Sequence, residues 1–224
     1  MAKTFFLAIS FFFATLPVFV LAHDGSTVNS LATNSLSRII LPAPNRTDGK
    51  TVGQALSKRE SCRAYARKGL DRQTLSDLLW ATAGINRPDG RRTAPSAYGR
   101  QSIELYVVLD EGVYRYQADC NALVPLAAGR FQKATGFQSF VETAPVNLLF
   151  VADFSKLPVP DSDKPFLLGV DAGTMSQNAS LYCSSKGLGT VVRAGIDGAA
   201  FGKILGLPEQ KRILLAQTVG WPAR

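Results

Sequence analysis

Apolar residues recur along this chain in two rhythms, one typical of helices and one typical of strands. In DRQTLSDLLWATAGI, residues 71–85, leucines recur at intervals of three and four, which predicts an amphipathic helix. Asp71 or Thr74 can accept hydrogen bonds from the free amides of its first turn, and Gly84 can end it. TVGQALSKR, residues 51–59, predicts a shorter helix.

Period-two patterns and short apolar runs predict the strands. They are a hairpin over residues 103–117 (IELYVVL, DEG, VYRYQ), a buried strand in 143–154, and two strands in 187–196 and 212–221. A long helix of small and apolar residues is expected over 165–186, and a short one over 197–207 with Asp197 as its N-cap. Because these elements do not alternate as βαβ units, we expect an α+β fold with a largely antiparallel sheet.

The N-terminal segment MAKTFFLAISFFFATLPVFVLA, residues 1–22, has the layout of an export signal. Lys3 precedes a long apolar run, which ends in small residues at Val20-x-Ala22. The run is nearly long enough to span a bilayer, so an uncleaved membrane anchor is the alternative. Pro17 favours cleavage after Ala22, and we expect a protein secreted across the inner membrane into the periplasm.

Composition limits the number of domains and the class of partner. With 224 residues, 46% of them hydrophobic, the chain can bury one sizeable core. One domain is therefore expected over 51–224, after an arm or linker over 23–50 that is rich in Ser, Asn, Thr and Pro. The net charge is +8, but the cations are scattered, so a local anion site explains the charge better than nucleic acid does.

Histidine and cysteine are scarce, which excludes several kinds of chemistry. His23 is the one histidine and falls in the arm, so catalytic triads that need a histidine inside the domain are excluded. Cys62, Cys120 and Cys183 show no CxxC spacing, and neither a metal site nor a thioredoxin-type site is predicted. Three cysteines allow at most one internal disulfide, and the spacing does not decide its partners.

Two segments could bring a backbone or a cation to an anionic ligand. In KRESCR, residues 58–63, an extended chain would place Arg59, Ser61 and Arg63 on one side, where guanidinium forks suit a phosphate. Taken alone this motif is weak, because such a pattern is common on solvated surfaces. In GLGTVVRAG, residues 187–195, three glycines would let the backbone approach a ligand. An ordinary connection between a helix and a strand explains these glycines equally well.

A third segment, RRTAPSAYGRQ (residues 91–101), has the composition of a functional loop. It would bring backbone donors and the Ser96 hydroxyl to the mouth of the following strand. Tyr98 and Arg100 would be free to face a cavity, and Tyr116 in the hairpin is a further candidate for lining a substrate pocket.

Taken in chain order, the three segments resemble the nitroreductase superfamily of FMN-dependent enzymes, most closely the SagB/thiazoline-oxidase-like dehydrogenases. Further matching stretches are IELYVV, GVYRY, FVETAPVNLLFVADF, ILGLP and VGWP, and the match spans roughly residues 50 to 222. The resemblance implies a nitroreductase-like fold with helices flanking the sheet. It also implies an intertwined homodimer that holds FMN at its interface.

The resemblance also implies a set of cofactor-binding residues: Arg59, Ser61, Arg63, Pro95, Ser96, Ala97, Gln101, Ala194, Gly195 and Arg224. The first three would bind the FMN phosphate, with Arg224 reaching it from the chain end. The loop at Pro95 would lie along the flavin, and the amides of Ala194 and Gly195 would face N5. Where many members have Asn, this chain has Gly99, so Gln101, Arg100 or water would have to replace that contact.

These features together predict an exported FMN-dependent oxidoreductase that transfers hydride through flavin N5 to or from a small organic substrate. NAD(P)H is a conceivable donor but is scarce outside the cytoplasm, so a substrate C–H bond could serve instead. A membrane partner is expected only if the export segment is not cleaved. The alternatives are a non-catalytic flavin-binding protein and a degenerate nitroreductase fold acting as an interaction module, which Gly99 and the short chain end would favour.

Overall fold

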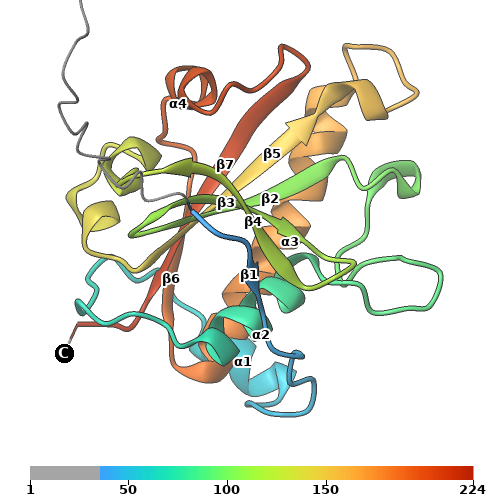
Figure 1. The fold of residues 1–224 in the computed structure, drawn as a ribbon. Coiled ribbons are helices and arrows are strands. Elements are labelled where there is room, and N and C mark those ends of the chain that lie inside the picture. Colours follow the sequence, from blue (N-terminus) through green and yellow to red (C-terminus); the bar gives the residue numbers. More distant parts are fainter. Residues whose placement is uncertain (1–35, 224) are drawn as a thin grey trace, which may run out of the picture. The chain divides into compact units, whose positions relative to one another are not determined.

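The computed structural model describes residues 36–223, so the expected export segment and Arg224 lie outside the described residues. Its centre is a seven-stranded antiparallel sheet with the strand order β1-β4-β3-β2-β5-β7-β6 (Figure 1). The strands are β1 (Ile39–Ile40), β2 (Ile103–Leu109), β3 (Gly112–Gln117), β4 (Ala122–Ala128), β5 (Val146–Asp153), β6 (Gly189–Arg193) and β7 (Lys211–Gly220).

Over the described residues, four α-helices and four short 3-10 helices accompany the sheet. The α-helices are α1 (Val52–Lys58), α2 (Arg72–Ala83), α3 (Lys164–Lys186) and α4 (Gly198–Ile204). The 3-10 helices are η1 (Ala97–Gly99), η2 (Gln132–Thr135), η3 (Ser139–Glu142) and η4 (Phe154–Lys156). The α+β class with an antiparallel sheet is confirmed, as are the elements predicted from the periodicity. Strand β4 was not predicted.

Local signals explain where the helices begin and end. The Asp71 carboxylate accepts a hydrogen bond from the Thr74 amide at 2.8 Å and so caps α2, as expected. Asp197 caps α4 by accepting from the Ala200 amide at 2.9 Å. Helix α3 ends at Gly187, whose φ of 74° lies in the left-handed region that glycine adopts without strain.

The sheet buries a hydrophobic core on each of its faces. On one face, leucines of α2 and the small and apolar residues of α3 pack on alternate residues of β2 and β5, including Leu105 and Phe150. On the other face, Phe201 of α4 packs against the intervening residues Tyr106 and Leu149. Figure 1 shows α2 and α3 grouped away from α4. Within residues 36–223, no helix combines the length and apolar character that crossing a membrane requires.

The described part of the expected arm, residues 36–50, lies against the domain. Strand β1 pairs with β4, and Leu41 is buried in the core. The Ser76 hydroxyl donates to the Pro42 carbonyl at 2.6 Å, and the Asn45 amide donates to the Asp77 carboxylate at 2.8 Å. These contacts fix this segment on the N-terminal half of α2.

Candidate functional site

A cavity of about 490 Å³ lies where the end of α1, the end of α3 and the start of β6 meet, next to Pro222. Its lining consists of Lys50, Ser57, Lys58, Arg59, Glu60, Cys62, Ser180, Ser184, Gly187, Leu188, Gly189, Thr190 and Pro222. Three of these residues are cations and one is an acid. We refer to it as the basic cavity, because its charge favours an anionic ligand.

Backbone pairing brings two of the predicted segments together at this cavity. The Cys62 amide donates to the Thr190 carbonyl at 2.9 Å, and the Ala66 amide donates to the Trp221 carbonyl at 2.8 Å. The chain that follows α1 therefore passes from the start of β6 to the residues that directly follow β7. A Cβ atom at Gly189 would lie 2.6 Å from the Cys62 sulfur, so only glycine allows this approach.

Not all residues of the Arg-x-Ser-x-Arg motif line the cavity. Arg59 does, whereas Ser61 and Arg63 are exposed and lie outside the lining. The backbone of Ser61 pairs with that of Thr190. The sequence interpretation missed Lys58 and Lys50. Lys58 directly precedes Arg59 and could have been found from that position. Lys50 precedes α1, whereas Arg59 follows it, and no sequence motif includes Lys50.

The segment after β6 presents free backbone donors. Among the described residues, no acceptor pairs with the amides of Ala194 and Gly195, both predicted to face a flavin. The preceding Arg193 is buried, and its guanidinium donates to the Thr135 carbonyl at 2.7 Å and to the Asn147 amide oxygen at 3.1 Å. Burial lowers the pKa of Arg193 to about 10. These bonds fix the position of the adjacent amides.

The predicted Pro-Ser-Ala loop is held by α3 rather than left open. The Ser96 hydroxyl donates to the Asp171 carboxylate at 3.0 Å, and the Ala97 amide donates to the same carboxylate at 2.9 Å. The Ser96 oxygen also accepts from the Gln101 amide at 2.8 Å. Pro95 itself is exposed. The hydroxyl expected at the mouth of the strand is thus occupied in shaping the loop, and Asp171 was missed by the sequence interpretation.

The pocket candidates do not gather in one place. Tyr98 and Arg100 are exposed on this loop, where Tyr98, Gly99 and Gln101 all have positive φ angles. Tyr116 is buried in β3, and its hydroxyl donates to the Asn121 amide oxygen at 2.9 Å. Burial raises the pKa of Tyr116, so this hydroxyl stays protonated as a structural donor.

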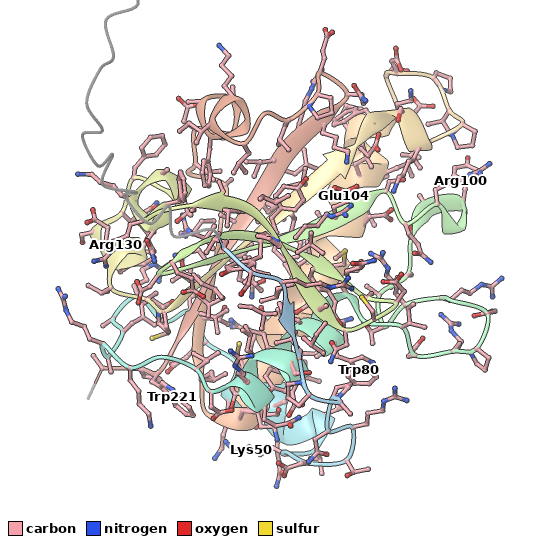
Figure 2. All side chains as sticks on the ribbon, in the orientation of Figure 1. Lys50, Trp80, Arg100, Glu104, Arg130 and Trp221 are labelled. Atoms are coloured by element: carbon pink, nitrogen blue, oxygen red, sulfur yellow. The ribbon has the colours of Figure 1, made fainter. Side chains whose placement is uncertain are left out.

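One helix separates the loop from the basic cavity. Asp171 of α3 holds the loop, and the lining of the cavity begins on the same helix at Ser180. Nine residues of helix rise about 14 Å. Figure 2 shows Arg100 of the loop at the upper right and Lys50 of the basic cavity at the bottom of the view.

The model of the nitroreductase family matches residues 56–221 of this chain. A protein of Methanocaldococcus jannaschii with nitroreductase in its name is 29% identical over 171 residues, or 71% of this chain and 86% of that protein. A crystal structure of a nitroreductase-named protein from Ralstonia eutropha has a TM-score of 0.80 and 39% identity, over 84% of this chain and 90% of that one.

A more distant neighbour is the NADPH:FMN oxidoreductase from Vibrio harveyi in complex with NAD+. It covers 77% of this chain and 69% of its own, with a TM-score of 0.59 and 21% identity. At 21% identity, this similarity shows a shared fold and nothing further.

Proposed function

Because this chain belongs to the nitroreductase family, we propose that it is an FMN-dependent oxidoreductase acting on a small organic substrate. The family supports an oxidoreductase, and the Vibrio harveyi neighbour is named for FMN and NADPH. The observation that carries the cofactor is the basic cavity, in which Arg59 meets the glycine-rich turn before β6.

The residues present fit FMN at two of its groups. Arg59, Lys58 and Lys50 supply cations for the phosphate at the basic cavity. The amides of Ala194 and Gly195 have no acceptor within residues 36–223 and could donate to the ring. Bound FMN would supply hydride transfer at N5, and the chain's own task is to hold and orient the ring and the substrate.

A complete site on this plan draws on two copies of the chain. The loop at Pro95 supplies no residue to the lining of the basic cavity, and Asp171, which holds the loop, lies about 14 Å along α3 from Ser180, where that lining begins. We therefore propose a homodimer in which the loop of one copy borders the flavin of the other. Tyr98 and Arg100, exposed on that loop, would then face the substrate.

The electron donor and the location follow from the same proposal. The N-terminal segment, with its long apolar run before Ala22, supports export to the periplasm. Outside the cytoplasm a substrate C–H bond is a more accessible hydride source than NAD(P)H. We propose a dehydrogenase of this kind, as in the SagB/thiazoline-oxidase-like branch, with NAD(P)H as the donor to test beside it.

The cofactor is tested by the visible absorption of the purified protein before and after adding FMN and desalting. We expect about one retained FMN per chain. The double substitution K58Q and R59Q should abolish retention, and K203Q on the exposed side of α4 should not. A chain that stays colourless, or a double variant that stays yellow, would refute the assignment of the basic cavity.

The composite site is tested by mixing two defective variants. One carries K58Q and R59Q, and the other carries D171A, which releases the loop. Neither should retain FMN alone. After exchange of subunits in an equal mixture, about a quarter of the sites contain no substitution and should bind FMN. No recovery on mixing would place both segments at one site within a single chain.

A further inference from the structure

A second cavity, of about 300 Å³, opens where strands β2 and β3 separate. It shares no lining residue with the basic cavity. We refer to it as the β2–β3 cavity. Its volume is at the lower end of the range for ligand sites, which suits a small molecule.

The separation of the two strands creates this space. Their pairing runs from Leu109 opposite Gly112 to Tyr106 opposite Arg115 and stops there. The first residues of β2 remain paired with β5, and the last residues of β3 remain paired with β4. The facing backbone edges of β2 and β3 are therefore parted, which a continuous sheet does not allow.

Arg92 fills part of this gap without satisfying its own hydrogen-bonding groups. Its Nη1 atom donates to the Ile103 carbonyl at 3.3 Å. Its Nε atom is buried and has no hydrogen-bond partner among the described residues. Burial also lowers the pKa of Arg92, so an anion placed beside it would relieve the cost of the buried charge.

Two further cations line the cavity and lack a carboxylate partner. Within residues 36–223, neither Arg115 nor Lys156 forms an ion pair. Of the two acids in the lining, Glu104 is already paired with Lys211 at 2.8 Å. Asp119 is exposed and accepts a hydrogen bond from the Cys120 amide. The cavity therefore has an excess of positive charge.

The remaining wall is mainly apolar, with Gln101 and Gln117 as its neutral polar residues. Ile85, Leu105 and the ring of Tyr116 line it, and Leu105 and Tyr116 belong to the main hydrophobic core. Figure 2 shows Glu104, which marks the β2–β3 cavity on β2, well away from Lys50 of the basic cavity. A ligand here meets both cations and hydrocarbon side chains.

We propose that the β2–β3 cavity binds a small organic carboxylate with an apolar body. The carboxylate would lie between Arg92, Arg115 and Lys156, with the guanidinium of Arg92 gaining the acceptor that its Nε lacks. The body would pack on Leu105 and Tyr116. This site does not depend on the flavin assignment, since its binding can be measured with or without FMN.

The test uses calorimetric titration of the purified protein with benzoate. We expect one binding site, with benzamide and acetate each bound at least about tenfold more weakly, because one lacks the charge and the other the apolar body. Absence of binding by benzoate, or equal binding by benzamide, would overturn the proposal.

Variants locate the binding. R115Q and K156Q remove cations without breaking an ion pair, and each should weaken benzoate binding by about fivefold or more. The matched control is R130Q, whose side chain is exposed and lies outside this cavity, and which should leave benzoate binding unchanged. Binding unaffected by R115Q and K156Q would overturn the site. So would a benzoate-induced change in the FMN absorption spectrum that persists in both variants, since it would place the anion beside the flavin.

Discussion

Arg193 carries a positive charge into the interior with only neutral groups around it. Its guanidinium donates to Thr135, Asn147 and Thr218, and no carboxylate forms an ion pair with it within the described residues. A buried charge is tolerated only when its donors are satisfied, and the planar fork of arginine reaches three partners at once. Lysine cannot reproduce this geometry.

The substitution R193K should therefore destabilise the fold more than R193M does. Lysine keeps the buried charge but cannot form the hydrogen bonds that the planar guanidinium makes. Methionine removes the charge together with its desolvation cost. We expect R193K to lower the free energy of unfolding by about 2 kcal/mol or more at neutral pH. Urea denaturation measures both variants. A lysine variant as stable as the parent would show that the fork is dispensable.

Gly99 takes a backbone conformation that few residues adopt. Its φ of 66° is left-handed, and a Cβ atom added there would meet nothing within 4 Å. Asparagine visits this region more readily than other residues with a side chain, so the backbone at this position can accept it.

Accordingly, G99N should fold with nearly unchanged stability, while G99A should lose about 1 kcal/mol because of left-handed strain. The added amide should also tighten FMN binding in the asparagine variant. Urea denaturation gives the first result, and quenching of FMN fluorescence on titration gives the second. If G99A matches G99N in both, neither strain nor the amide matters at this position.

At the scale of elements, the loop of residues 95–101 depends on a helix distant from it in sequence. Asp171 of α3 accepts hydrogen bonds from Ser96 and Ala97, and the positive φ angles of Tyr98 and Gln101 store strain of about 1 kcal/mol or more each. Removing the carboxylate would release the loop from this strained shape.

We expect D171A to increase amide hydrogen exchange in residues 95–101 while α3 stays protected. Exchange measured by mass spectrometry on the parent and the variant would show this. S176A, one to two turns further along the same helix, is the matched control, because its hydroxyl bonds only within α3. Exchange that rises along the whole of α3 in D171A would instead indicate a general loss of structure.

The elements show what the sequence could predict. Helix α2 followed from its leucine spacing and Asp71, because both signals lie within the element itself. Strand β4 did not, since ALVPLAA contains Pro125 and lacks a period-two pattern. Pairing with β3 makes it a strand. Asp171 was missed for a similar reason: its partners lie 74 and 75 residues away, and no local pattern connects them.

At the scale of the whole molecule, buried tyrosines determine the response to alkali. Burial raises the pKa of Tyr106 and of Tyr114 to about 12, and raises those of Tyr65, Tyr116 and Tyr182 further. Between pH 10 and 12 the unfolded chain loses protons that the folded chain keeps. The lowered pKa values of Arg193 and Arg92 act in the opposite direction, but they are two groups against five.

The free energy of unfolding should therefore fall as the pH rises from 10 to 12. Urea midpoints measured across this range would show the loss, and tyrosinate absorption should rise at higher pH in the folded protein than in urea. A midpoint that does not change up to pH 12 would contradict the burial of these hydroxyls.

The order of the motifs was sufficient to predict the fold and the family, because several matched stretches, such as IELYVV on β2 and VNLLFVAD on β5, lie on strands of the sheet. It did not predict how those stretches meet. The basic cavity depends on Cys62 pairing with Thr190, and the β2–β3 cavity depends on where two strands part. Both are long-range events that no window of sequence contains.

Strand β1 protects one edge of the sheet. A chain shortened to begin at Thr51, the boundary that composition suggests, would lose this strand and leave β4 as a bare edge. It would also uncover the place in the core that Leu41 fills and remove the carbonyl to which Ser76 donates. Unpaired edges invite pairing with other chains, so such a fragment would aggregate for reasons unrelated to its cofactor. Residues 36–50, which the composition assigns to a linker, thus protect the edge of the sheet from aggregation.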